Sequence, residues 1–429
     1  MSVGSGVKSA SLARVKIEGK GSGQGTGIYA AGGETVTLTE VTISRVQTGV
    51  YAEKGTLIMK DGTTIEFTGN YGVSVGNDVK SADLTRVKIT GKGKGTGVYA
   101  VGGNVMVSGG EIKKVQMGIA MSGGTLMVKD GTTIEFTNGV GVYVGDKVES
   151  ATLMGTTITG QNNGKGSTGI YAVGAESLMM TLEGVKISGV KKGVRMEGKS
   201  LTISGHSTIS FMGDYGVKLG SSVTRADLKD VTIRGKNNGT GVHAVGKEGM
   251  VMRLDGVTVS QVETGVKVER GTLIMEGGEI KGFTGNGVYV GNDVTSASLK
   301  GTRIRGQNQG IGVSTGIHAK GMTGMVMTLD DVKISKVGVG VKVEKAKSLM
   351  IRGENSTISF MGEYGVYVGS EVTSTSLKGT TITGQDKGIR GLCGGDDRDG
   401  DDVGWGEDFK GTNGGLCKEG DVGDGEGVD

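Results

Sequence analysis

The 429-residue sequence has no proline, only two cysteines and one tryptophan, and its aromatic residues make up 4% of the chain. Without proline, and without a three-residue glycine period, a collagen-like triple helix is excluded. The shortage of aromatic residues and of long apolar runs argues against a bulky globular core and against a membrane span. We therefore expect no membrane insertion of this chain.

Glycine, in contrast, is abundant, with 87 residues, so we expect turns that rely on the access of glycine to positive φ. A Gly-Ile or Gly-Val step recurs sixteen times at a mean spacing of 24 residues. The glycines of these steps are 27, 49, 72, 97, 118, 141, 169, 193, 216, 241, 265, 287, 316, 340, 365 and 388. A period of this length, built from short alternating apolar runs, predicts an all-β solenoid in which each repeat forms one coil.

The pattern within a coil supports strands rather than helices. Leu84, Val87 and Ile89 alternate with polar residues, as expected of a half-buried strand. Coils of three kinds follow one another in a fixed order, which gives a super-repeat of about 72 residues. Tandem duplication of a three-coil unit explains this order. The sequence thus predicts a parallel solenoid of about 16 coils over residues 1–390.

Residues 391–429 differ from the rest. They hold both cysteines, Cys393 and Cys417, with 3 basic and 12 acidic residues, whereas residues 1–390 hold 45 basic and 33 acidic residues. An acidic disordered extension and a disulfide-closed cap are two interpretations. A calcium site at Asp397, Asp399 and Asp401 is a third, but the EF-hand pattern requires Gly and Glu where Asp402 and Asp408 stand.

Codon arithmetic favours another origin for this segment. Shifting the reading frame by one base allows Asp401–Gly425 to be read as MTLDGVKISKVQTGVYVKRGTLVME, which matches the in-frame Met252–Glu276 at 17 of 25 positions. We interpret residues 391–429 as an out-of-frame translation of the next coils, and we expect them to lack regular structure.

The first residues point the same way. Val3–Leu12 parallels Val75–Leu84, so we expect the chain to open within a coil. We find no charged region followed by an apolar stretch, which is the pattern of a secretory signal. We expect an interior fragment whose uncapped ends promote end-to-end self-association.

Two features could bind a partner. The first is the residue after each Gly-Ile or Gly-Val step, which should point outward and stack into a column. An aromatic and basic column without a carboxylate suits acidic glycans or nucleic acid, although Tyr and Lys are also ordinary residues on an exposed sheet. The column reads Tyr29, Tyr51, Ser74, Tyr99, Ala120, Tyr143, Tyr171, Arg195, Lys218, His243, Lys267, Tyr289, His318, Lys342, Tyr367 and Arg390.

The second feature is a Gly-rich loop in every third coil, with lysines that we expect in solvent: Lys20, Lys92, Lys94, Lys165 and Lys236. These loops lack the Gly-Lys-Ser/Thr ending and the following helix of a phosphate-binding loop. A solvated insertion is the plain interpretation, and loops are also where binding sites commonly arise.

Catalysis has less support. Asp61, Asp130, Glu66 and Glu135 recur as repeat positions rather than forming one constellation, and His206, His243 and His318 lie in different super-repeats. We therefore expect no enzyme, no metal and no cofactor. A secreted polysaccharide-active enzyme is the alternative, and so is a complete secreted β-helix with a genuine acidic cap.

The phrases GTGVYA, LTRVKI and GTTIEFTGNYGV resemble those of the right-handed parallel β-helix passenger domains of bacterial autotransporters, over residues 1–390. The resemblance implies a right-handed β-helix that is displayed at the outer membrane or secreted and that adheres to host cells. The expected partners are a host-cell surface protein or an acidic glycan, and not nucleic acid. The absent signal peptide and barrel put the export of this particular product in question.

Overall fold

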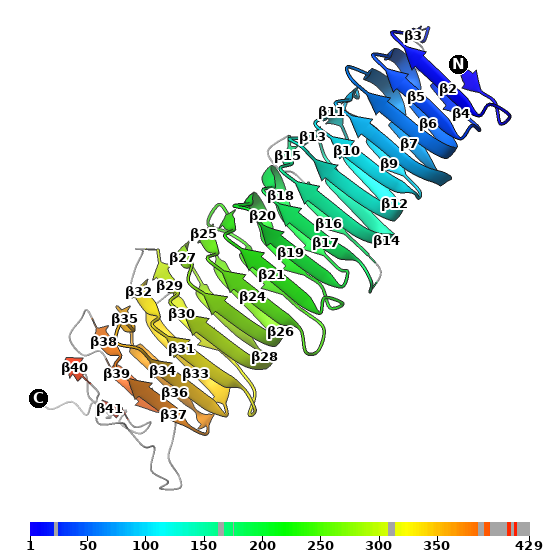
Figure 1. Ribbon diagram of the computed structural model, residues 1–429. Coiled ribbons are helices and arrows are strands. Elements are labelled where there is room, and N and C mark those ends of the chain that lie inside the picture. Colours follow the sequence, from blue (N-terminus) through cyan, green and yellow to red (C-terminus); the bar gives the residue numbers. More distant parts are fainter. Residues whose placement is uncertain are drawn as a thin grey trace, which may run out of the picture. The chain divides into compact units, whose positions relative to one another are not determined.

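The computed structural model describes residues 1–20, 25–161, 167–174, 176–307, 314–384, 390–394, 410–412 and 416–417 (Figure 1). These residues form parallel β-strands and turns, and they contain no helix that is long and apolar enough to cross a membrane. The chain divides into two compact units. The first consists mainly of residues 1–226 and the second mainly of residues 234–429. The predicted fold class, an all-β, right-handed parallel β-helix, is confirmed.

Strands of unit 1 are β1 (Ser2–Val3), β2 (Ser9–Ala13), β3 (Lys16–Glu18), β4 (Thr26–Ala30), β5 (Thr35–Thr39), β6 (Thr42–Lys60), β7 (Thr64–Thr85), β8 (Lys88–Thr90), β9 (Thr96–Ala100), β10 (Asn104–Ser108), β11 (Glu111–Val115), β12 (Met117–Lys129), β13 (Thr133–Phe136), β14 (Val140–Met154), β15 (Thr157–Gly160), β16 (Thr168–Ala172), β17 (Met179–Glu183), β18 (Lys186–Met196), β19 (Ser200–Ser204) and β20 (Thr208–Leu219). The unit boundary falls within β21 (Arg225–Lys229) and β22 (Thr232–Arg234).

Strands of unit 2 are β23 (Thr240–Ala244), β24 (Val251–Asp255), β25 (Thr258–Val262), β26 (Thr264–Glu276), β27 (Glu279–Phe283), β28 (Asn286–Lys300), β29 (Arg303–Gly306), β30 (Thr315–Ala319), β31 (Val326–Asp330), β32 (Lys333–Val337), β33 (Val339–Ala346), β34 (Ser348–Arg352), β35 (Thr357–Phe360), β36 (Tyr364–Val372), β37 (Thr375–Lys378), β38 (Thr381–Gly384), β39 (Arg390–Gly394), β40 (Lys410–Thr412) and β41 (Leu416–Cys417).

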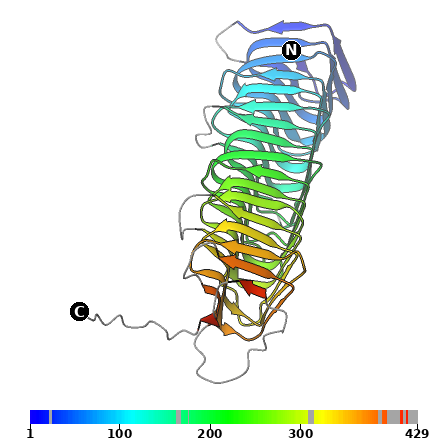
Figure 2. The same cartoon turned by 90° about the vertical axis from the view of Figure 1, so that its left-hand side faces the viewer.

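Successive coils pair in parallel within each unit, so that strands of neighbouring coils lie side by side (Figure 2). In unit 1, β6 and β7 pair from Thr42 and Thr64 to Lys60 and Thr85. In unit 2, β26 and β28 pair from Val266 and Val288 to Glu276 and Lys300. Strands between the first and last coils therefore satisfy their backbone hydrogen bonds through the coils on either side, which is how a solenoid is stabilised.

Alternation along each strand places the apolar residues inside. The TVTLT segment of β5 alternates between half-buried threonines and the buried Val36 and Leu38. Five phenylalanines, about one per super-repeat, are at most 1% exposed and fill the interior: Phe67, Phe136, Phe211, Phe283 and Phe360. The core is therefore a stack of ladders rather than a globular centre, as the composition predicts.

Turns use glycine less exclusively than we expected. Non-glycine residues such as Asp61, Arg86 and Asp130 have φ values near +50°, in turns where other coils place glycine. The repeated Gly-Ile or Gly-Val step needs glycine for a different reason. At Gly169, which has no positive φ, a Cβ atom would lie 2.6 Å from Ile187 Cγ2 and 2.8 Å from the carbonyl oxygen of Gly193. Close packing between neighbouring coils therefore leaves no room for a side chain at the glycine of the step.

Part of the segment 391–429 pairs with the preceding coils. β39 pairs with β36, while β40 and β41 pair with β38 and β39. The remainder of this segment, including the calcium candidates, lies outside the described residues, so the reading-frame interpretation stays a prediction. One detail of the predicted column is wrong: Cys393, and not Arg390, lies opposite Tyr367, because β39 pairs with its register displaced by three residues.

Candidate functional site

The predicted column is present in each unit, although two of its residues, Ser74 and Ala120, are buried at 5% exposure instead of facing solvent. In unit 1 the register joins Tyr29, Tyr51, Ser74, Tyr99, Ala120, Tyr143, Tyr171, Arg195 and Lys218 in that order. In unit 2 it joins His243, Lys267, Tyr289, His318, Lys342 and Tyr367. We call these two sets the aromatic column of each unit. The parallel register, in which each residue lies beside its counterpart in the next coil, produces this alignment.

Aromatic rings in the column contact one another. The rings of Tyr29 and Tyr51 stack with centroids 5.3 Å apart and planes only 8° from parallel. Tyr143 and Tyr171 meet edge to face at 5.8 Å, and Arg195 lies over the Tyr171 ring at 4.9 Å. Tyr29 is 37% exposed, so its ring is available to a ligand. Stacked rings that keep a polar edge in solvent combine an apolar surface with hydrogen-bonding groups.

The column itself contains no carboxylate, as the sequence indicates, but three of its four Arg and Lys side chains pair with carboxylates at neighbouring positions. A glutamate two residues along the same strand pairs with them: Arg195 with Glu197 at 2.8 Å, and Lys267 with Glu269 at 2.7 Å. Because strand residues two apart share a face, these glutamates lie beside the aromatic column, one in the second coil of four of the super-repeats: Glu53 and Glu197 in unit 1, and Glu269 and Glu344 in unit 2. The two-residue period of a strand was the sequence signal that could have predicted these glutamates on the face of the column.

Hydrogen bonds from the column residues to these glutamates keep the donor protonated and the carboxyl group ionised. The bond from the Tyr29 hydroxyl to Glu53, 2.8 Å long, raises the pKa of Tyr29. Burial raises the pKa of Glu344, but the hydrogen bonds from His318 and Lys342, each 3.0 Å, outweigh it and leave the pKa of that carboxyl below its usual value. Glu344 is therefore held as a carboxylate that orients its neighbours.

The two histidines of the column occupy equivalent places in successive super-repeats. His243 Nε2 lies 3.6 Å from Glu269, and His318 Nε2 lies 3.0 Å from Glu344. His318 also meets Tyr289 edge to face at 5.5 Å. His206, the third histidine, lies in a turn with φ of 55° and belongs to neither column. Both column histidines are thus part of the polar surface.

Lysines of the Gly-rich loops are exposed, as predicted, at Lys20, Lys92, Lys94 and Lys236, while Lys165 lies outside the described residues. The loop of Lys92 and Lys94 is anchored to the next coil by backbone hydrogen bonds, including one of 2.7 Å from Gly93 to Lys114. Within the described part of the chain, these four lysines make no ion pair with the aromatic columns. The structure therefore keeps the loops and the columns as separate features.

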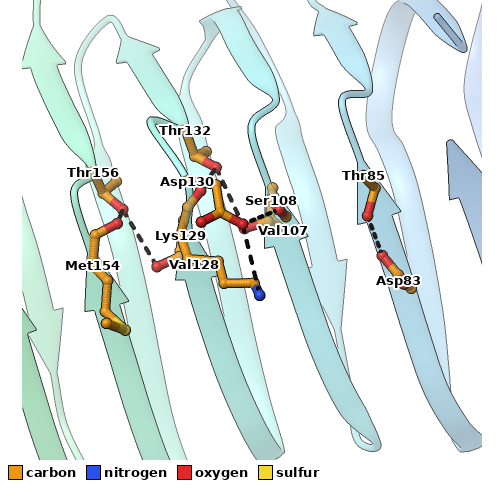
Figure 3. Close-up of polar contacts among 10 residues, drawn as sticks. All are labelled: Asp83, Thr85, Val107, Ser108, Val128, Lys129, Asp130, Thr132, Met154 and Thr156. Carbon is orange, nitrogen blue, oxygen red and sulfur yellow. Dashed lines mark hydrogen bonds and ion pairs between the residues drawn. The ribbon is translucent and has the colours of Figure 1, made fainter. Parts of the chain in front are cut away.

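Carboxylates that recur in the sequence build turns (Figure 3). Asp130 accepts a 2.6 Å hydrogen bond from Ser108 and lies 3.6 Å from Lys129, while the buried Thr132 donates to the Lys129 carbonyl at 2.7 Å. Asp61 pairs with Arg86 in the corresponding turn. Among the residues that the structure describes, no three His, Cys, Asp or Glu side chains are arranged to hold a metal ion.

Unit 2 also carries an open groove of about 470 Å³ beside its aromatic column. Sequence reasoning missed it, because no single motif marks it. Its lining comes from β28, β33, β36 and the turn after β30: Asn292, Lys320, Gly321, Met322, Thr323, Glu344, Lys345 and Glu371. Small-molecule sites commonly have volumes of about 300–1,000 Å³, so the groove is large enough for a ligand.

Comparison with known proteins supports the fold and leaves the ligand open. No curated protein and no solved structure matches the chain. Residues 26–181 match the family model described as a right handed beta helix region.

Proposed function

We propose that this chain is a non-catalytic interaction module, a part of an autotransporter-like passenger, whose aromatic columns bind saccharides of a host-cell surface. The observation that carries the proposal is the in-register alignment of tyrosines along each column. Tyr29 is exposed, its ring stacks on the half-buried Tyr51, and its hydroxyl donates a hydrogen bond to Glu53. Sugars present apolar C–H faces and hydroxyl groups, and this surface offers a partner for both.

The charge balance of the columns narrows the class of saccharide. Three of the four Arg and Lys side chains in the columns, Arg195, Lys267 and Lys342, pair with a glutamate, while the fourth, Lys218, lies against the Tyr215 ring. A densely anionic polymer would gain little from these paired cations. We therefore assign neutral or weakly acidic saccharides to the columns. A host-cell surface protein remains the second class of partner that the resemblance to autotransporters suggests.

We also propose that the carboxylates of this chain take no part in catalysis. Asp61 and Asp130 are engaged in turns, and the column glutamates each hold a neighbouring cation or hydroxyl. Hydrolysis of a glycosidic bond requires two carboxyl groups placed on either side of it. The repeated, mutually paired carboxylates described above favour binding over bond cleavage.

A pair of variants tests the role of the column. Tyr29→Ser together with Tyr51→Ser removes the stacked pair, and we expect saccharide affinity to fall by about tenfold, which corresponds to about 1.4 kcal/mol. Met127→Ser is the matched control, since Met127 is 41% exposed on a different strand segment of unit 1. Equal affinities of the double variant, the control and the unaltered chain in calorimetric titration would refute the role of the column.

A further inference from the structure

The groove of unit 2 is formed by elements that are fixed before any ligand arrives. The paired strands β33 and β36 contribute Glu344, Lys345 and Glu371 to its lining. The turn after β30 contributes four more lining residues and is closed by a 2.9 Å hydrogen bond from Met325 N to the Met322 carbonyl. Met322 is 36% exposed and Thr323 is exposed, so both side chains remain accessible. A preformed site loses little conformational entropy on binding.

Charges in the groove are compensated with one exception. Lys345 pairs with Glu371 at 2.7 Å, and Glu344 receives both Lys342 and His318 at 3.0 Å. Lys320 is exposed and has no ion-pair partner among the described residues. The groove thus presents a single uncompensated cation beside an amide, a hydroxyl and two fixed carboxylates.

The other super-repeats show that this cation is specific to the fifth copy. In the first coil of each super-repeat, the Gly-Ile or Gly-Val step ends on an alanine. The residue directly after that alanine is Ala31, Val101, Val173 and Val245 in the first four super-repeats, and Lys320 in the fifth. The fourth super-repeat has an equivalent ion pair, since Arg270 pairs with Asp293 at 3.0 Å where the fifth pairs Lys345 with Glu371. The pairs are therefore a common structural element, whereas Lys320 is an addition to it.

We propose that this groove binds one sugar acid, a carboxylate-bearing residue of a cell-surface saccharide, with Lys320 holding the carboxylate. The side chains of Asn292 and Thr323 and the carboxylate oxygens of Glu344 and Glu371 lie around the groove as hydrogen-bonding partners for hydroxyl groups, and Met322 offers an apolar contact to the ring. This assignment deepens the proposed saccharide-binding function and rests on it.

Electrostatics favour a carboxylate over a phosphate or sulfate polymer. One exposed cation balances one negative charge, whereas Glu344 and Glu371 repel a ligand that carries several. A sugar hydroxyl, in contrast, donates a hydrogen bond to a carboxylate, and such charge-assisted bonds are stronger than neutral ones. The same two glutamates thus exclude polyanions and orient a hydroxylated ligand.

The test uses the full chain and two defined probes, a tetrasaccharide of glucuronic acid and N-acetylglucosamine and a sialylated trisaccharide, each beside its carboxyl-reduced counterpart. We expect at least one acidic probe to bind about tenfold more tightly than its reduced form, which corresponds to about 1.4 kcal/mol. The probe that binds identifies the sugar acid as a uronic or a sialic acid. Lys320→Val, which restores the residue of other copies, should abolish this preference, and Lys320→Arg should keep it.

Lys247→Val is the matched control, because Lys247 is an exposed lysine in the corresponding turn of the fourth copy. It should leave the preference for the acidic probe intact. Equal affinity for acidic and reduced probes, or an unchanged preference in Lys320→Val, would overturn the assignment of the groove. If the Tyr29 and Tyr51 variant still loses affinity in that case, the proposed function stands without this site; if no saccharide binds at all, both fail.

Discussion

Substituting the glycine of one step by alanine tests whether close packing between coils determines the repeat. Gly169 begins the step in β16, and the added Cβ would lie 2.6 Å from Ile187 Cγ2 and 2.8 Å from the Gly193 carbonyl oxygen. Carbon atoms in ordinary contact are about 3.5–4.0 Å apart, so the two coils must separate locally. The backbone φ of Gly169 is not in the left-handed region, so overpacking is the cause of any destabilisation.

The expected size follows from overpacking in other protein cores. Inserting one methyl group into a filled core costs about 1–3 kcal/mol. We expect the upper part of this range, since one of the two contacts is a backbone carbonyl that cannot rotate away as a side chain could. Gly6→Ala is the control, because nothing lies within 4 Å of a Cβ at that position. The control should change the free energy of unfolding by less than about 0.5 kcal/mol.

Urea unfolding followed by far-ultraviolet circular dichroism gives the comparison, with midpoints interpreted at a common slope. Gly169→Ala should lower the midpoint clearly, while Gly6→Ala should coincide with the unaltered chain. Coincident curves for all three proteins would refute the reasoning, because they would mean that the coils have room for a side chain at the step.

Two further predictions concern individual side chains. Burial raises the pKa of Tyr215, which is 6% exposed, to about 12. Since the folded pKa lies above the unfolded one, stability present below pH 10 should decline by about 2 kcal/mol between pH 10 and 12. Tyr215→Phe should reduce that decline, and equal decline in both proteins would contradict it. Thr132→Val removes the 2.7 Å hydrogen bond to the Lys129 carbonyl in a fully buried site and should cost about 1–3 kcal/mol. The half-buried Thr64→Val should cost less, and equal midpoints would argue against the turn hydrogen bond.

Much of the architecture is predictable because it repeats. The 24-residue spacing of the glycine step and the alternation within each strand together determine which residues point inward, and the register confirms this from Tyr29 to Lys218 and from His243 to Tyr367. The prediction failed at Arg390, where counting from glycine to glycine does not follow the pairing of β39. Spacing alone cannot reveal a displaced register.

The chemistry of the surface was less predictable. Considering one outward residue per coil suggested an aromatic and basic column that suits acidic glycans. Glu197, Glu269 and Glu344, two residues further along their strands, pair with three of its four Arg and Lys side chains. The groove depends on side chains from four chain segments, so its volume follows from three-dimensional packing rather than from a motif. Its single sequence signal is Lys320, which departs from the alanine and valines of the other copies.

Native mass spectrometry of the full chain with a panel of defined neutral and acidic saccharides tests the central claim most directly, because one spectrum reports both binding and the integrity of the bound saccharide. The account predicts saturable complexes in which the saccharide mass is unchanged after prolonged incubation. Cleaved or eliminated products, or no complex with any member of the panel, would contradict it.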